Sequence, residues 1–191
     1  ADEPRFVLVA RHMVEHGDWL FPHRGAQLYA DKPPFYFWLL AASYLLVGSW
    51  RWSFLLPSLL AGLGTLWLTF DAGRRLWNAR AGLWAAAAVL ATPAFVYQAK
   101  RAQIDPTLVL LTTLALYGML RHLLLGPAWR WLHLGCFAAG LGVITKGVGF
   151  LPLLALLPFA WMRHARWPGL AAPGAGDALR WTLGALAFFA A

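Results

Sequence analysis

Long stretches without a charged residue constrain the fold of this chain more than any other feature of its sequence. Two such stretches cover residues 81–99 and 106–120. An α-helix rises about 1.5 Å per residue, so about 20 apolar residues cross the hydrocarbon core of a bilayer. Charged residues make up 13% of the chain, whereas soluble domains carry about 25%. The sequence therefore predicts an all-α integral membrane protein.

Apolar runs recur along the chain at 35–49, 53–70, 82–99, 106–120, 131–145, 147–162 and 179–191. We expect residues 1–52 to form a first extracytoplasmic loop, and residues 53–191 to form a polytopic transmembrane bundle of about six spans. The chain has no initiator methionine and ends inside an apolar run. We therefore interpret it as a fragment of a longer protein, with a truncated last span.

The first apolar run is too short to cross a bilayer. Its uncharged part extends only from Pro33 to Trp50, which gives about 14 helical residues, or about 21 Å of helix rise against a core of about 30 Å. The segment before it has apolar residues at helical spacing, namely Phe6, Val9, Ala10, Met13 and Val14. We expect 4–16 to be an amphipathic helix lying along the membrane, and 35–49 to be an interfacial or re-entrant helix.

The loop charges give an independent test of this interpretation. If 35–49 does not cross the membrane, the loops at 71–80, 121–130 and 161–167 share one side and carry seven arginines and one aspartate. The positive-inside rule assigns these loops to the cytoplasm. The other side then holds all three lysines and several acids: Lys32, Lys100, Lys146, Asp2, Glu3, Asp31 and Asp105. A crossing at 35–49 would split this group, so we predict that it gathers on one extracytoplasmic face.

Nucleic-acid, disulfide and metal-binding functions find little support in the sequence. The net charge is +8, but the basic residues are scattered singly or in pairs between apolar segments, which does not indicate binding to nucleic acid. The single cysteine, Cys136, lies in an apolar run and is expected to be a small core residue. His12, His16 and His23 lack a companion metal-binding acid pattern and are expected at the solvated surface.

Two lysines have neighbours that suggest phosphate binding. The pair Asp31-Lys32 is followed by two prolines, which would hold the Lys32 ammonium at the bilayer surface where a lipid phosphate would lie. The alternative is a salt-bridged helix start without a ligand. Lys146 lies between two apolar segments and near glycines, which permit close approach of a ligand. A Lys146 side chain that faces Lys32 would form a phosphate clamp.

Three carboxylates have structural as well as catalytic explanations. Asp2 and Glu3 would cap and begin the 4–16 helix, with Pro4 in its first turn. Asp105 precedes a proline and would cap the 106–120 helix. Ionisable residues near hydrocarbon are costly and often functional, so a catalytic role stays open for all three.

Three ordered segments carry a family resemblance: "DEPRFVLVARHMVEHGDWLFP" with "LYADKPPFYFWLL", then "AKRAQIDPTLVLLTTLAL", then "ITKGVGFLPLL". Together they resemble the bacterial members of the protein O-mannosyltransferase superfamily, and most of all the aminoarabinose transferases that modify lipid A. The resemblance covers nearly the entire chain. It implies a multispanning GT-C glycosyltransferase whose first outer loop carries the catalytic acid and an interfacial helix.

The resemblance also implies residue roles. Asp2 would be the catalytic carboxylate, and the substrate-binding set would be Glu3, Arg5, Asp31, Lys32, Asp105 and Lys146. Within this set Arg5 and Lys32 would contact the phosphate of a polyprenyl-phosphate sugar donor, and the last two residues would line the same outward cavity. The family often has Glu where this chain has Asp31. A divalent metal contact there stays open, and no metal ligand is assigned.

The sequence thus predicts a multi-pass inner-membrane glycosyltransferase with its active site facing the periplasm. It would transfer a sugar from an undecaprenyl-phosphate-type donor to lipid A or another envelope acceptor. Cations would stabilise the departing phosphate, and a carboxylate would act as general base. No nucleotide is needed, in keeping with a sequence that has no Rossmann fingerprint or P-loop. The alternative is a transporter or flippase of a lipid-linked sugar, but the one-sided placement of the charges favours transfer chemistry.

Overall fold

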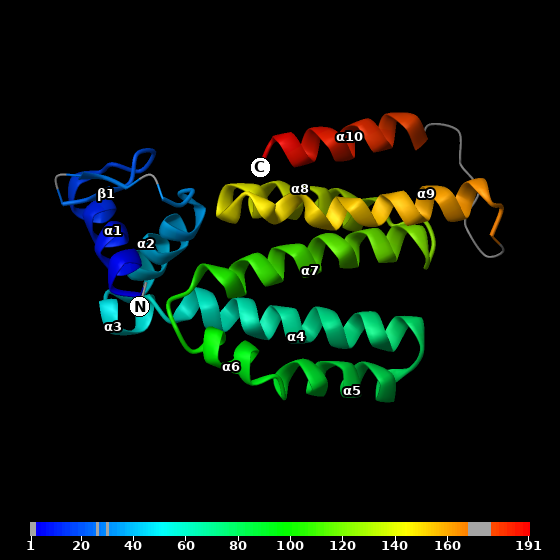
Figure 1. Cartoon of the computed structure of the whole chain (residues 1–191), viewed down its shortest axis with the longest axis horizontal. Coiled ribbons are helices and arrows are strands. Elements are labelled where there is room, and N and C mark those ends of the chain that lie inside the picture. The colour runs from blue at the N-terminus through cyan, green and yellow to red at the C-terminus, as the bar shows by residue number, and fades with distance from the viewer. Residues whose placement is uncertain (1–2, 26, 30, 168–176) are drawn as a thin grey trace.

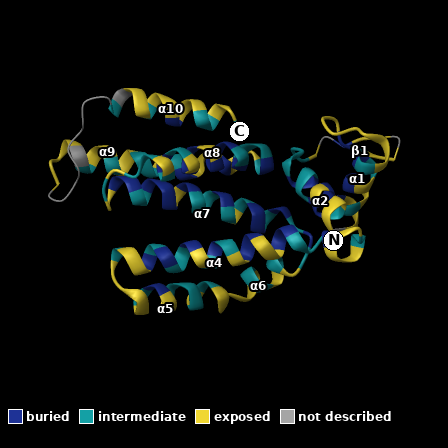
Figure 2. Cartoon of the chain, turned by 180° about the vertical axis from the view of Figure 1, so that it is seen from behind, coloured by how far each residue is buried: buried dark blue, intermediate teal, exposed yellow. Residues whose placement is uncertain are grey.

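Most of the chain forms long helices that run back and forth side by side (Figure 1). The computed structural model describes residues 3–25, 27–29, 31–167 and 177–191. The bundle consists of α4 (Leu56–Leu76), α5 (Ala79–Leu90), α6 (Pro93–Ala99), α7 (Ile104–Leu123), α8 (Trp129–Lys146), the 3-10 helix η1 (Val148–Ala155), α9 (Leu156–His164) and α10 (Asp177–Phe189). Figure 2 shows buried residues concentrated along α7, which lies between α4 and α8.

Three further helices gather at one end of this bundle (Figure 1). They are α1 (Glu3–His16), α2 (Phe35–Val47) and α3 (Trp50–Ser53), and the link between the first two contains the strands β1 (His23–Arg24) and β2 (Gln27–Leu28). The strands form an antiparallel hairpin that the sequence patterns did not predict. In Figure 1 α2 lies at the left end of the bundle rather than among its long helices.

The apolar face predicted for α1 is present, but it packs against protein. Phe6, Val9, Ala10 and Met13 are almost completely buried and form one core cluster with Tyr36, Phe37 and Leu40 of α2. Burying one large apolar side chain contributes about 1.5–3 kcal/mol, so this contact holds the two helices together. This face is therefore covered by α2, and the expected position of α1 along the membrane stays a prediction.

The outer faces of the bundle helices expose large apolar side chains. Leu63 and Trp67 of α4 and Leu83 and Trp84 of α5 are all more than half exposed. Two helices, Trp50–Leu76 and Ile104–Leu123, are long and apolar enough to cross a membrane, and the pair α5 and α6 would make a third. Other apolar helices in the described residues, such as Val148–Met162, are shorter, so the expected six spans stay a prediction.

Two helix boundaries differ from the expected runs. The run at 82–99 is divided into α5 and α6, which meet at an angle of 72°. The division falls at Thr92, which is extended and precedes Pro93, as the clash of a proline ring with a preceding helical residue requires. The helix expected to end at residue 70 instead continues to Leu76, because Asp71 is satisfied within the helix by arginines three and four residues later.

The contact between α7 and α8 depends on small residues. A Cβ atom on Gly118 would lie 2.2 Å from the backbone oxygen of Trp131, so only glycine allows this approach. Cys136 is 7% exposed and belongs to the adjoining core cluster with Met119 and Leu132, which confirms its assignment as a core residue.

Candidate active site

The carboxylate of Asp105 and the ammonium of Lys146 form an ion pair between the start of α7 and the end of α8. Lys146 Nζ lies 2.5 Å from Asp105 Oδ1, and each side chain is 40% exposed. The two residues are far apart in sequence, and the parity of the predicted crossings placed them on the same face. Their contact creates a charged, solvent-accessible point at the end of the bundle that also carries α1 and α2 (Figure 1).

Local backbone structure explains why both side chains sit at helix ends. Lys146 is the last residue of α8, and Gly147 follows with φ of +62°, a value that favours glycine. Asp105 lies in the first turn of α7, where the helix dipole favours a negative charge. The expected cap is not formed by Asp105, because the N-cap position is occupied by the extended Gln103.

A buried polar contact fixes α2 to this end of the bundle. The Tyr36 hydroxyl lies 3.2 Å from Ser58 Oγ, and Ser58 Oγ donates to the backbone oxygen of Gln103 at 3.2 Å. Tyr36 and Ser58 are both fully buried. The contact thus joins α2, α4 and the backbone two residues before Asp105. Sequence reasoning missed it, although polar side chains inside apolar runs are a usable signal.

The Asp31-Lys32 segment leads directly into α2. Asp31 is exposed and lines a cavity of about 160 Å³ with residues of the hairpin, and Lys32 is half-buried. Tyr29 packs edge-on against Phe37, with ring centroids 5.6 Å apart. The backbone nitrogen of Trp38 donates to the Pro34 oxygen, so the helix begins directly after the two prolines, as predicted.

The first turn of α1 is held close to the first turn of α7. Phe6 and Ile104 belong to the same core cluster, which also contains Tyr36. Their sequence neighbours Arg5 and Asp105 therefore lie at the same end of the molecule, and Arg5 is exposed. Asp2 lies outside the described residues. Glu3 begins α1, and its side chain also lies outside them.

The arrangement differs in one respect from a clamp of two lysines. Lys146 was expected to face Lys32, but the group that it contacts is the carboxylate of Asp105. A lysine ammonium has three donors, so this contact leaves others for a ligand. The carboxylate also fixes the position of the ammonium, which a flexible lysine otherwise lacks.

The histidines near the hairpin form a stack rather than a metal site. The rings of His12 and His16 are parallel, with centroids 4.1 Å apart, and His23 lies 5.8 Å from His12. Both His12 and His23 are half-buried, which is more than expected for surface histidines. Within the described part of the chain, no three His, Cys, Asp or Glu side chains are grouped to hold a metal ion.

Comparisons with known sequences identify similar proteins. Residues 31–190 match the family described as dolichyl-phosphate-mannose-protein mannosyltransferase. The chain is 31% identical over 186 residues to an undecaprenyl phosphate-alpha-4-amino-4-deoxy-L-arabinose arabinosyl transferase of Pseudomonas paraeruginosa, an alignment that covers 91% of this chain and 33% of the relative. It is 30% identical over 173 residues to arabinosyl transferase 1 of the same description from Pseudomonas fluorescens, covering 86% and 31%.

Solved structures agree with the sequence comparisons. The fold is similar to crystal structures of ArnT from Cupriavidus metallidurans in the apo state and bound to undecaprenyl phosphate, each with a TM-score of 0.83. The identities are 29% and 28%, and all of this chain aligns with 35% of either structure. The chain therefore spans about a third of the length of the relatives that it matches.

Proposed function

The chain belongs to the dolichyl-phosphate-mannose-protein mannosyltransferase family, and from this premise we propose that the full-length protein is a membrane glycosyltransferase. It transfers a sugar from a polyprenyl-phosphate donor, of the undecaprenyl-phosphate type, to an envelope acceptor such as lipid A. The names of the relatives, which are arabinosyl transferases with an undecaprenyl phosphate-linked aminoarabinose, support this choice of donor. The ArnT structure bound to undecaprenyl phosphate supports it further.

The protein is a multi-pass protein of the inner membrane. The active site is proposed to face the periplasm, at the end of the bundle that carries α1, α2 and the Asp105–Lys146 pair. This assignment rests on the arginine-rich loops at the other end, which the positive-inside rule assigns to the cytoplasm. The single observation that carries the proposal is the meeting of α1, α2, the start of α7 and the end of α8 at one place.

The proposed reaction is one displacement at the anomeric carbon. The acceptor hydroxyl oxygen forms a bond to this carbon while the bond from the carbon to the lipid phosphate oxygen breaks, which inverts the configuration. The hydroxyl proton passes to the carboxylate of Asp2, the general base. The bonding electron pair leaves with the lipid phosphate, whose added negative charge is stabilised by Arg5, Lys32 and Lys146.

Asp105 has a positioning role in this scheme. Its carboxylate holds the Lys146 ammonium at 2.5 Å, so the cation is in place before the donor binds. Preorganised charges are more effective than mobile ones, because they need not reorganise as the phosphate charge develops. Glu3 and Asp31 complete the proposed substrate-binding set beside these cations.

The test is a transfer assay with the full-length protein in detergent, polyprenyl-phosphate sugar as donor and lipid A as acceptor. Asp2→Asn is expected to lower the transfer rate by about 10²–10⁴-fold, the usual contribution of a general base, with donor binding retained. Glu15→Gln, at an exposed carboxylate of α1, is the matched control. Full activity of Asp2→Asn would remove the mechanism. Absence of transfer by the wild-type protein would favour a transporter, since transport has no meaning in detergent.

A further inference from the structure

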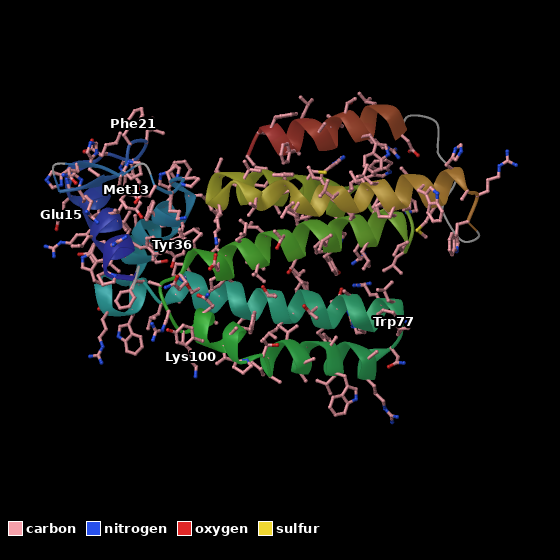
Figure 3. All side chains as sticks on the ribbon, viewed as in Figure 1. Met13, Glu15, Phe21, Tyr36, Trp77 and Lys100 are labelled. Carbon is pink, nitrogen blue, oxygen red and sulfur yellow. The ribbon has the colours of Figure 1, made fainter. Side chains whose placement is uncertain are left out.

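A second cluster of charges lies at the opposite end of the bundle from the proposed active site. Its centre is Asp71, in the last turns of α4, whose side chain is 3% exposed. Asp71 accepts hydrogen bonds from Arg74, from Arg75 Nε at 2.5 Å and from the Tyr117 hydroxyl of α7. Figure 3 labels Trp77, the residue after α4, at the end of the bundle opposite Tyr36.

A third arginine joins this cluster from the last turn of α7. Arg121 Nη1 donates to the Tyr117 hydroxyl at 3.0 Å, and its guanidinium lies 5.3 Å from the centroid of the Trp131 ring. The guanidinium groups of Arg74 and Arg75 thus contact the Asp71 carboxylate directly, and that of Arg121 is linked to it through the Tyr117 hydroxyl. The cluster has more positive charge than its own carboxylate can neutralise.

This surplus of positive charge faces a cavity. The cavity has a volume of about 410 Å³ and is lined by Arg75, Arg121, Leu125, Gly126, Pro127 and Ala128. Its other wall is the turn between α7 and α8, where Gly126 has φ of +110°, a value that favours glycine. Ligand sites commonly have volumes of about 300–1,000 Å³, so a small anionic group fits.

Arginine is the side chain best suited to a phosphate in such a place. Its planar guanidinium donates two parallel hydrogen bonds to phosphate oxygens and is less strongly hydrated than an ammonium. Here Asp71 and Tyr117 already fix the arginines, so binding an anion costs little side-chain freedom. The carboxylate oxygens of Asp71 already accept hydrogen bonds from these side chains. The guanidinium N–H groups that do not bond to Asp71 or Tyr117 stay available to a phosphate.

We propose that this arginine cavity binds a phosphate group, supplied by the headgroup of an anionic membrane lipid. The cavity lies among the loops that the positive-inside rule assigns to the cytoplasm, and basic pockets between transmembrane helices on that side bind anionic headgroups. A free phosphate ion has the same chemistry and is the other source. The site is separate from the proposed donor site, since it lies at the other end of α4 and α7.

The experiment measures binding to the purified full-length protein in detergent, using thermal stabilisation by phosphatidylglycerol, phosphatidylcholine or inorganic phosphate. Wild-type protein is expected to be stabilised by phosphatidylglycerol and not by phosphatidylcholine. Arg121→Gln is expected to raise the apparent Kd for phosphatidylglycerol about tenfold, which is typical of the loss of one hydrogen bond to a charged group. Arg80→Gln removes an exposed arginine at the same end of the bundle, outside the cavity, and is the matched control.

The three ligands and the two arginine variants distinguish a lipid headgroup from a free phosphate ion, and either of them from no site. A response to phosphatidylglycerol alone supports the lipid headgroup, and an Arg121-dependent response to inorganic phosphate supports the site with a free ion as ligand. Arg121→Gln protein that binds phosphatidylglycerol as tightly as Arg80→Gln overturns the proposal, as does equal stabilisation by phosphatidylcholine. If Arg121→Gln does not fold, Arg121→Lys decides, because it keeps the charge and loses the paired donors. The proposal requires that Arg121→Lys binds phosphatidylglycerol more weakly than the wild-type protein does.

Discussion

The two ends of the bundle treat an aspartate in opposite ways. Asp71, at the arginine-rich end, has a side chain that is 3% exposed, whereas the Asp105 side chain at the other end is 40% exposed. Asp71 accepts hydrogen bonds from three side chains on two helices. Within the described residues, Asp105 accepts a side-chain hydrogen bond from Lys146 alone.

This difference separates a carboxylate that serves the fold from one that is able to serve a ligand. The oxygens of Asp71 are already used, and its surroundings exclude a substrate. Asp105 and Lys146 keep unused acceptors and donors in a solvent-accessible place. Exposure and unused hydrogen-bonding capacity, rather than charge alone, therefore identify the candidate active site.

The largest expected effect tests the structural role of Asp71. Asp71→Ala leaves the buried Tyr117 hydroxyl and two partly exposed arginines without their acceptor, and an unsatisfied buried polar group costs about 1–3 kcal/mol. The free energy of unfolding of the full-length protein in detergent is the measurement. Asp18→Ala, at an exposed aspartate in the α1–β1 link, is the control and should change it little. A small loss from Asp71→Ala would break the comparison between the two ends.

The second effect tests the functional role of Lys146. Lys146→Gln is expected to lower the transfer rate by about 10²-fold, since one donor to the developing charge is lost. The cost in unfolding free energy should stay below about 1 kcal/mol, because the ion pair is partly exposed. Transfer assays and unfolding curves measured on the same preparation separate the two effects.

Lys100→Gln is the matched control for this variant. Lys100 is an exposed lysine directly after α6, and Figure 3 labels it at the same end of the bundle as Tyr36. Transfer by Lys100→Gln should equal that of the wild type. A loss of stability in Lys146→Gln as large as that in Asp71→Ala would instead give the Asp105–Lys146 pair a structural role.

Hydropathy and loop charge predicted the helices and the placement of the charges at two ends. The family and the helical membrane fold that the motifs indicated are confirmed by the matches to known proteins. The short run at 35–49 became α2, whose 13 residues lie at the end of the bundle. These features follow from local composition and from the number of crossings, which a single sequence contains. The catalytic and binding roles of the individual residues stay predictions.

Contacts between side chains of different helices could not be predicted from the sequence. No local pattern indicates that Tyr36 meets Ser58, or that Tyr117 meets Asp71, because each contact joins different helices and depends on how they rotate against each other. The sequence pattern placed Asp71 in a loop, since a charge normally ends an apolar run. In fact the neighbouring arginines and Tyr117 satisfy it inside the helix.

A smaller effect tests how α2 is held against the bundle. Tyr36→Phe removes the hydroxyl that contacts Ser58 and should lower the unfolding free energy by about 1 kcal/mol, the usual contribution of one hydrogen bond. The transfer rate should fall less than in Lys146→Gln, because the hydroxyl contact with Ser58 holds α2 in position and does not stabilise the developing phosphate charge. A double-mutant cycle with Ser58→Ala measures the pair directly. Additive effects of the two substitutions would show that the contact contributes nothing.

The smallest effect concerns an exposed ion pair on α1. Arg11 Nε lies 2.7 Å from Glu15 Oε1 on the outer face of α1, and the hydrogen bond and charge of Glu15 raise the pKa of Arg11. A raised pKa adds stability only while the group is protonated, and that stability disappears when the pH rises through the arginine pKa. Arginine is protonated throughout the range from about pH 6 to pH 9, so no charge changes there.

Glu15→Gln should therefore leave both the melting temperature and its pH profile unchanged over this range. Solvent screens exposed pairs, and holding two long side chains together costs conformational entropy, so such pairs contribute little to stability. The distance in this pair is close to the 2.5 Å between Arg75 and the buried Asp71, so comparing these two pairs tests exposure as the deciding variable. A fall in melting temperature as large as that of Tyr36→Phe would mean that short distance, and not burial, sets the strength of ion pairs in this molecule.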